Sequence, residues 1–253
     1  MRCSRFLMCL AAHVALGAIL CVPSFARDFQ ETVTKGSPDV FAQTPSVGAP
    51  APYNATDTTY FIHVPDDYSA DRSYALVLAL SPGNDGKDMF TPWEKAAEKY
   101  GLIFACPNNA GNTVRTDTRG QMALDTLSDV RRKFSVDAEQ IYVTGFSGGG
   151  RMSTGMVLAF PGLFAGLIPM GGIIFNNDFD AMARLNVKRG VYIFVGETDF
   201  NRSESERAKQ IAEKAGTPVA LMIAPGVEHV KASADQVLEI YEWFLARGGA
   251  ATK

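Results

Sequence analysis

A serine flanked by glycines, placed directly after an apolar run, is the feature that most constrains this chain. Residues 141–144, Ile-Tyr-Val-Thr, read as a buried strand, and Gly145-Phe146-Ser147-Gly148-Gly149 follows at once. Glycine on both sides lets the backbone turn tightly from a strand into a helix, so that the serine hydroxyl is presented at the turn. Because G-x-S-x-G also occurs by chance in glycine-rich chains, its meaning depends on the other residues the chain supplies.

Two further side chains could complete a catalytic site with Ser147. The chain has three histidines, His13, His63 and His229, and only His229 follows the serine. Between the two lies Asp199, just past another apolar run. A histidine can accept the proton of a serine hydroxyl, and a carboxylate can hold that histidine in the required tautomer. The order Ser, Asp, His along the chain is that of the α/β-hydrolases.

Two carboxylates compete for the role of the acid. Glu197 and Asp199 both lie just past the apolar run Val191–Val195, at the kind of strand end where catalytic groups collect in open α/β sheets. We favour Asp199, because the acid usually sits a few residues into this loop, and Glu197 remains the alternative. His63 lies inside a strand pattern and is expected to be structural.

The apolar pattern from Thr58 onward predicts the fold class. Short apolar runs alternate with amphipathic stretches, which is typical of an α/β fold with a mostly parallel central sheet and helices on both faces. The short interval between Phe146 and Asp199 leaves little room for a large lid. Strands are expected at 59–64, 74–80, 102–106, 141–146, 166–170, 191–195 and 219–223, and helices at 89–100, 118–134, 149–159, 203–215 and 232–247.

The N-terminal residues read as an export signal rather than as part of the fold. A short basic start precedes a long apolar run, and small residues then offer a cleavage position after Ala26. The alternatives are a permanent membrane anchor and a lipoprotein attached through Cys21. We therefore expect a signal peptide at 1–26, an extended arm at 27–57 and one catalytic domain at 58–253, in a secreted or periplasmic protein.

Cysteine usage and charge exclude several classes of function. Three of the four cysteines lie in the expected signal peptide, so the mature chain keeps Cys106 alone and can form no internal disulfide. Cys106 lies in an apolar run and is expected to be an inert core thiol. The formal net charge of −3 gives no basic field for nucleic acid and no polybasic patch for a membrane surface.

Hydrolysis through an acyl-enzyme also requires donors for the oxyanion. The N–H of Gly148 is one candidate, at the start of a helix whose dipole adds positive potential. The second is expected from the loop at 81–86, where Pro82 has no N–H and Gly83 is therefore the better donor. Candidate substrate-binding residues near the same sheet edge, each also compatible with packing or a surface position, are Asn84, Trp93, Asn109 and Phe200.

With these residues placed, the chain resembles the single-domain α/β-hydrolase esterases, and most of all the secreted polyhydroxybutyrate depolymerase and feruloyl esterase-like group. The most specific part is the stretch 136–150, V-D-A-E-Q-I-Y-V-T-G-F-S-G-G-G. The resemblance implies Ser147 as nucleophile, Asp199 as acid and His229 as base. The chain departs from the group at Ser81-Pro82, where members usually carry His-Gly.

The function expected from the sequence is an exported serine hydrolase that cleaves carboxylic esters through an acyl-enzyme. Its substrate would be a small-molecule or polymeric ester, and the mechanism needs neither metal nor organic cofactor. No nucleic acid and, after signal cleavage, no membrane is expected as a partner, and the oligomeric state is not predicted. The alternatives are a peptidase of the prolyl-oligopeptidase kind and a non-catalytic α/β-hydrolase domain that binds a ligand.

Overall fold

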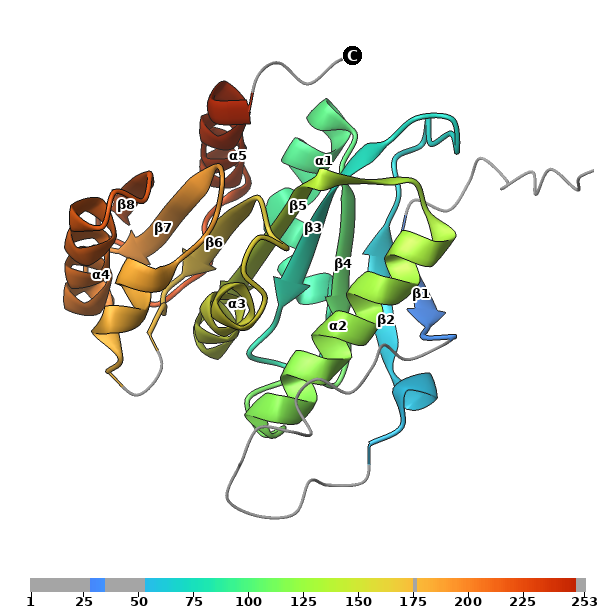
Figure 1. The fold of residues 1–253 in the computed structure, drawn as a ribbon, viewed down its shortest axis with the longest axis horizontal. Coiled ribbons are helices and arrows are strands. Elements are labelled where there is room, and N and C mark those ends of the chain that lie inside the picture. Colours follow the sequence, from blue (N-terminus) through green and yellow to red (C-terminus); the bar gives the residue numbers. More distant parts are fainter. Residues whose placement is uncertain (1–27, 35–52, 175–176, 249–253) are drawn as a thin grey trace, which may run out of the picture.

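One eight-stranded sheet organises the part of the chain that the computed structural model describes, residues 28–34, 53–174 and 177–248 (Figure 1). The strand order is β1-β2-β4-β3-β5-β6-β7-β8. Strand β2 runs antiparallel to both of its neighbours, and all other pairs are parallel. The strands are β1 Asp28–Thr32, β2 Thr59–His63, β3 Tyr74–Leu80, β4 Ile103–Pro107, β5 Val136–Phe146, β6 Gly166–Met170, β7 Gly190–Gly196 and β8 Val219–Ala224.

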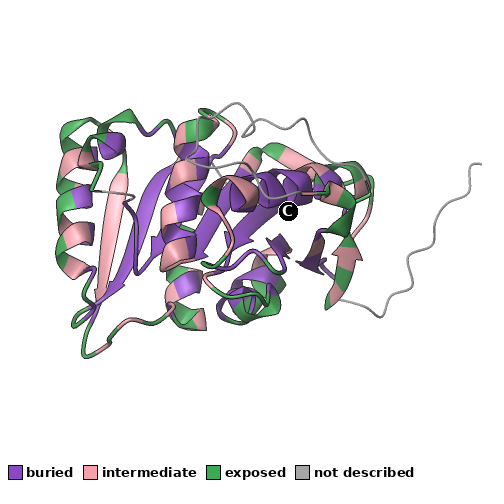
Figure 2. Ribbon diagram, turned by 90° about the horizontal axis from the view of Figure 1, so that it is seen from below, coloured by how far each residue is buried: buried purple, intermediate pink, exposed green. Residues whose placement is uncertain are grey.

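Helices cover both faces of the sheet, and the central strands between them are largely buried, whereas β1 and β8 at the two edges are partly exposed (Figure 2). Alternate side chains of β3 show this division. Leu76 and Leu78 belong to one hydrophobic cluster with side chains of α2, α3 and α4, whereas Val77 belongs to a second cluster with side chains of α1 and α5. The helices are α1 Glu94–Tyr100, α2 Thr116–Lys133, α3 Gly148–Ala159, α4 Arg202–Lys214 and α5 Ala234–Gly248, with 3-10 turns η1 Ala55–Asp57, η2 Lys87–Met89, η3 Thr91–Trp93 and η4 Phe179–Arg184.

The predicted α/β class, with a mostly parallel sheet between two helical layers, is confirmed. Strands β3, β6 and β7 are buried along their whole length, which explains why their sequences show aliphatic runs without polar alternation. The helix expected over 89–100 is wrong in its first half. Two 3-10 turns precede α1 there, because Pro92 has no N–H to donate and cannot continue an α-helix from the preceding turn.

The apolar stripe of the last helix packs into the core, as its spacing predicted. Val237, Ile240, Tyr241 and Phe244 are all buried in the cluster on the α1–α5 face. The rings of Tyr241 and Phe244 both lie about edge-on to that of Tyr142 on β5, with centroids 5.5 and 5.4 Å apart. These contacts attach α5 to the strand that leads into Ser147.

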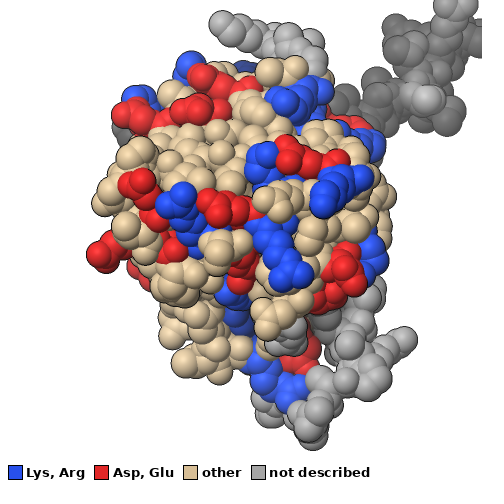
Figure 3. All heavy atoms as spheres, turned by 90° about the vertical axis from the view of Figure 1, so that its left-hand side faces the viewer, with Lys and Arg blue, Asp and Glu red and all other residues tan. Residues whose placement is uncertain are grey.

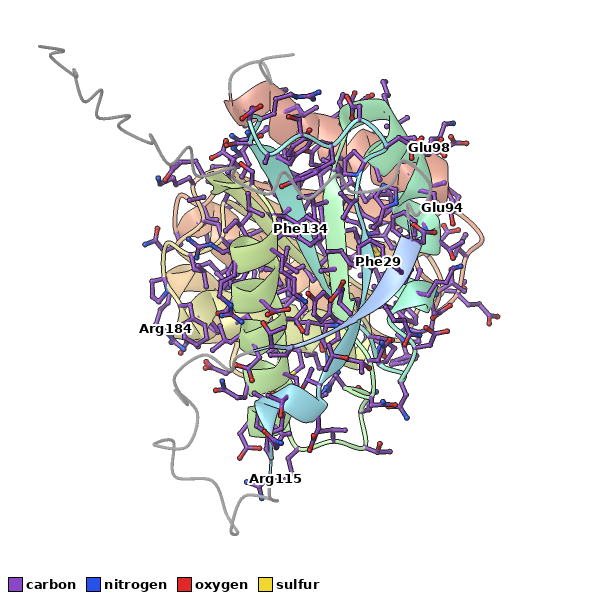
Figure 4. The ribbon with its side chains drawn as sticks, turned by 90° about the vertical axis from the view of Figure 1, so that its right-hand side faces the viewer. Phe29, Glu94, Glu98, Arg115, Phe134 and Arg184 are labelled. Atoms are coloured by element: carbon purple, nitrogen blue, oxygen red, sulfur yellow. The ribbon has the colours of Figure 1, made fainter. Side chains whose placement is uncertain are left out.

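The sheet begins before residue 58, within the segment expected to be an extended arm. Strand β1 pairs antiparallel with β2, and Asp28 lies opposite His63. Figure 4 shows β1, with Phe29, at the sheet edge beside α2. The expected signal peptide, residues 27 and 35–52 of the arm, residues 175–176 and residues 249–253 lie outside the described residues. Within the described ranges, no helix has the length and apolar character needed to span a membrane.

Asp129 on α2 joins the first described segment to the sheet and the helix. Its Oδ1 accepts hydrogen bonds from the backbone N–H and the hydroxyl of Thr34, and its Oδ2 accepts one from the Tyr60 hydroxyl over 2.8 Å. Lys133 lies 2.8 Å from the same carboxylate. Burial alone would raise the pKa of Asp129, but the hydrogen bonds from Lys133, Thr34 and Tyr60 outweigh it and hold that pKa well below its usual range.

His63 and Cys106 both have structural surroundings. His63 Nδ1 lies 2.9 Å from Asp28 Oδ1, and its ring stacks on Phe90 with centroids 4.6 Å apart. The Cys106 thiol is fully buried on β4, and this burial raises its pKa.

On the outer side of α4, basic and acidic side chains are interspersed (Figure 3). Arg202 and Glu206 form an ion pair one helical turn apart, and so do Lys209 and Glu213.

Candidate active site

Ser147 occupies a strained turn between β5 and α3. Its backbone has φ 53° and ψ −118°, a conformation that a residue with a side chain rarely adopts. The flanking glycines are required by close backbone approach. A Cβ on Gly149 would lie 1.9 Å from the carbonyl oxygen of Leu80, and one on Gly145 would lie 2.2 Å from the carbonyl oxygen of Gly149. The turn therefore fits between neighbouring strands only with glycine at these positions.

The structure brings Ser147, His229 and Asp199 together at the carboxyl ends of the strands. His229 Nε2 lies 2.9 Å from Ser147 Oγ, and His229 Nδ1 lies 2.9 Å from Asp199 Oδ2. The three side chains come from the end of β5, the loop after β7 and the loop after β8. With a proton on Nδ1, the imidazole donates to the carboxylate and can accept the hydroxyl proton at Nε2.

Asp199 is held on its other side as well. The side chain is fully buried, and Oδ1 accepts a hydrogen bond from the backbone N–H of Asn201 over 2.8 Å. Glu197, the alternative acid, is exposed, and its Oε2 accepts from the backbone N–H of Gly226 over 2.8 Å. The geometry thus favours Asp199 as the partner of His229 and places Glu197 in the turn after β8.

A polar network links Asp199 to the helix that starts at the serine. The side-chain amide of Asn201 donates to the carbonyl oxygen of Gly171 over 2.7 Å and accepts from Arg151 of α3 over 2.9 Å. Arg151 also forms two hydrogen bonds with the Glu204 carboxylate on α4. Glu204 in turn accepts the backbone N–H groups of Ile173 and Ile174, so that the loop after β6 is fixed too.

Two aromatic rings enclose the His229 imidazole. The ring centroid of Phe146 lies 4.7 Å from that of His229, and the ring centroid of Phe200 lies 4.5 Å from that of His229. Phe200 is 74% exposed and Val230, next to the histidine, is 45% exposed, and they are the exposed large hydrophobic residues among those described. Two exposed apolar side chains therefore lie at or next to the histidine, and a substrate contact at Phe200 stays a prediction.

The predicted oxyanion donors differ in their availability. Gly148 is the first residue of α3, so its N–H has no acceptor within the helix and lies at the positive end of the helix dipole. The N–H of Gly83, in contrast, donates to the Ser81 hydroxyl over 3.0 Å. The N–H predicted as the second oxyanion donor is therefore already bonded within the loop, in a turn closed by the Ser81 side chain. A serine two residues before the donor was the available sequence signal for this turn.

The loop at 81–86 is tied to the loop that follows β4. Asn84 accepts the backbone N–H of Asn109 at its carbonyl oxygen over 2.8 Å and the N–H of Gly111 at its Oδ1 over 3.2 Å. Asn84 and Asn109 are both exposed, and Asn109 has a positive φ of 55°. The structure thus gives these two predicted substrate contacts a role in joining the loops.

Trp93 does not line the site, contrary to the sequence-based expectation. Its side chain is fully buried in the cluster on the α1–α5 face, with its ring near those of Phe104 and Tyr241. The 3-10 turn η3 points the indole inward, and burying so large an apolar side chain is strongly favourable. The prediction is therefore corrected to a core role.

Arg119 joins the loop at 81–86 to the loop that follows β4. The sequence analysis did not identify this residue. Its side chain is buried, and its guanidinium donates to the carbonyl oxygens of Ala110 over 2.7 Å and Ser81 over 3.0 Å. Burial lowers the pKa of Arg119 from its usual value. Its place inside the helical pattern of α2 gave no sign of these contacts.

The described residues contain no group of three or more His, Cys, Asp or Glu side chains able to hold a metal ion.

An eight-stranded, mostly parallel sheet with a serine on the turn after β5 and a histidine after β8 defines an α/β-hydrolase fold. The solved feruloyl esterase module from Clostridium thermocellum, an S954A variant complexed with sinapinate, superposes with a TM-score of 0.64. The match has 15% identity and covers 89% of this chain and 99% of that one.

Sequence relatives point to a narrower group within that fold. The chain is 25% identical over 133 residues to acetylxylan esterase A of Emericella nidulans. This match covers 47% of this chain and 44% of the relative. The chain is 29% identical over 131 residues to the "Probable feruloyl esterase C" of Aspergillus niger, covering 47% and 48%. The chain spans about half the length of these relatives, and no family model matches it. The predicted resemblance to feruloyl esterase-like α/β-hydrolases is confirmed.

Proposed function

We propose that this chain is a serine esterase that hydrolyses carboxylic esters. The observation that carries the proposal is the alignment of one imidazole between a serine hydroxyl and a buried carboxylate, with 2.9 Å on each side. The relatives in sequence bear the names of esterases, which supports ester rather than peptide bonds as the target. Ser147 would be the nucleophile, His229 the general base and Asp199 the residue that orients it.

The proposed reaction proceeds in two halves. His229 Nε2 accepts the Ser147 proton as Oγ attacks the carbonyl carbon, and the oxyanion forms beside the N–H of Gly148. The imidazolium then donates its proton to the departing alcohol, which leaves an acyl group on Ser147. In the second half His229 deprotonates a water that attacks the acyl carbon, and return of the proton to Oγ releases the carboxylic acid.

The proposed substrate is a small-molecule or polymeric ester. The exposed apolar side chains of Phe200 and Val230 favour an acyl or alcohol group that lies across the surface. Acetyl and feruloyl esters of polysaccharides are the first to assay, because the relatives carry those names. Polyhydroxybutyrate, the other substrate suggested by the sequence resemblance, belongs in the same panel.

We also propose that the protein is exported through residues 1–26 and acts in the periplasm or outside the cell. The support is the sequence pattern alone, a basic start, an apolar run and small residues before Ala26. Expression of the whole chain followed by N-terminal sequencing of the exported form should give Arg27 as the first residue. A product that still begins at residue 1 would contradict the proposal.

The test of the esterase proposal compares wild type with Ser147→Ala on p-nitrophenyl esters and on aminoacyl anilides. The wild type should cleave the esters faster than the anilides, and Ser147→Ala should lose this activity. The matched control is Ser203→Ala, since Ser203 is exposed on α4. Faster cleavage of anilides would favour the peptidase alternative. Ester hydrolysis retained in Ser147→Ala would remove the proposed mechanism.

A further inference from the structure

The side-chain amide of Asn112 fills the space directly over Gly148. A Cβ built on Gly148 would lie 2.1 Å from Asn112 Oδ1, 2.7 Å from its Cγ and 2.8 Å from its Nδ2. By covalent geometry a Cβ lies only about 2.5 Å from the nitrogen of its own residue. The amide therefore lies next to the N–H that we propose to bind the oxyanion, in the place where the residue after the nucleophile would otherwise carry its side chain.

The position of Asn112 is fixed by its backbone. Its N–H donates to the carbonyl oxygen of Pro82 over 2.9 Å, and the neighbouring Gly111 N–H donates to Asn84 Oδ1. Arg119 joins both loops by donating to the carbonyl oxygens of Ser81 and Ala110. A side chain on so well-anchored a turn is preorganised for a contact, because little entropy is lost when it binds.

The amide of Asn112 has no hydrogen-bond partner among the described residues, unlike the amides of Asn84 and Asn108 in the same loops. Asn108 accepts the N–H of Gly86 and donates to Thr59, and Asn84 accepts the N–H of Gly111. The side chain of Asn112 makes no hydrogen bond to any other residue in the described ranges, and the residue is exposed. An amide carries two N–H donors and one acceptor oxygen, and those of Asn112 are available to a ligand that approaches Gly148.

The second oxyanion donor expected from the sequence is already engaged. The N–H of Gly83 donates to Ser81 Oγ, and Pro82 has no N–H. We infer that the side-chain amide of Asn112 donates a hydrogen bond to the carbonyl oxygen of the ester and to the oxyanion that forms from it, beside the N–H of Gly148. This inference rests on the proposed function and adds a catalytic residue to it. Rotation about the Cβ–Cγ bond exchanges the positions of the amide oxygen and nitrogen, so the donor can take the place that the oxygen has over Gly148.

The test compares Asn112→Ala and Asn112→Asp with the wild type on a p-nitrophenyl ester. Both variants remove the N–H donor, and the second keeps the shape of the side chain. We expect kcat to fall at least tenfold in each, with KM within threefold and an unchanged midpoint of thermal unfolding. Thr113→Ala, an exposed neighbour in the same turn, should retain wild-type kcat.

A thionoester of the same acid and alcohol separates a donor from a structural role. Sulfur accepts hydrogen bonds more weakly than oxygen, so the wild type should prefer the ester, and Asn112→Ala should lose at least fivefold of that preference. A kcat within twofold of wild type in both Asn112 variants, or an unchanged ester preference, overturns the inference. If the wild type hydrolyses the ester and Ser147→Ala does not, such a result leaves the proposed function standing and rejects only the role of Asn112.

Discussion

The backbone N–H of Asn201 donates to Asp199 Oδ1 over 2.8 Å, while the other oxygen of that carboxylate faces His229. The side chain of the same asparagine bridges Gly171 and Arg151. Asn201 thus holds the acid, the loop after β6 and the helix after the serine in one arrangement. Its contacts act on the orientation of the imidazole through Asp199.

Replacing Asn201 with Ala should lower kcat by about tenfold or more with a small change in KM. The variant leaves the Gly171 carbonyl and one Arg151 N–H without their partner, so the Asp199 loop can shift, and small displacements of catalytic groups are costly. Steady-state kinetics on a p-nitrophenyl ester would measure this. Glu206→Gln is the control that should behave as wild type, because Glu206 lies on the helix that follows Asn201 and pairs, within the described part of the chain, with Arg202 alone.

Arg119→Met should lower the free energy of unfolding by about 2 kcal/mol, because two buried carbonyl oxygens lose their donor. Arg119 bonds both Ser81 and Ala110, so the change should also loosen the loops beside the active site and lower kcat. Urea unfolding followed by intrinsic fluorescence gives the stability. Unfolding curves that superpose with those of the wild type would contradict this role of Arg119.

Asp129→Asn should lower the free energy of unfolding at neutral pH, and this destabilisation should disappear in acid. The pKa of Asp129 is lowered in the folded protein, so its stabilising contribution is present above the unfolded value of about 3.9 and disappears as the pH falls toward the folded value. The difference in unfolding free energy between wild type and variant should therefore stay constant from pH 7 to about 5 and shrink below about 4. A difference that grows in acid would show that the sign is wrong.

Gly148→Ala should fold but lose activity by the same factor as Asn112→Ala. The new Cβ would lie 2.1 Å from Asn112 Oδ1, and that exposed side chain can turn away. The double variant should then be no slower than either single variant, because both remove the same contact. Gly149→Ala offers the contrast. Its Cβ would lie 1.9 Å from the Leu80 backbone oxygen, which cannot move aside, so it should unfold at lower urea concentration.

The fold and the three central side chains could be predicted because each depends on a local pattern. Aliphatic runs such as that of β3 identify strands buried on both faces, and parallel strands place Ser147, Asp199 and His229 at one sheet edge. The sequence order alone therefore restricts where these residues can meet.

The finer parts of the site depend on contacts between segments distant in sequence. That Asn112 lies over Gly148 follows from hydrogen bonds between two loops, and no spacing in the sequence encodes them. Trp93 lies in the core because its indole packs beside the rings of Phe104 on β4 and Tyr241 on α5, and its spacing in the sequence does not encode these contacts. Gly83 was expected to be a free donor, but Ser81 competes for its N–H within the loop itself.

The most direct measurement of the central claim is the rate at which a fluorophosphonate labels the protein, with the modified peptide identified by mass spectrometry. His229 lies 2.9 Å from the Ser147 oxygen, so the wild type should take up one label on Ser147 and His229→Ala should react at least 100-fold more slowly. Absence of labelling in the wild type, or labelling of His229→Ala at the wild-type rate, would contradict an activated serine at this site.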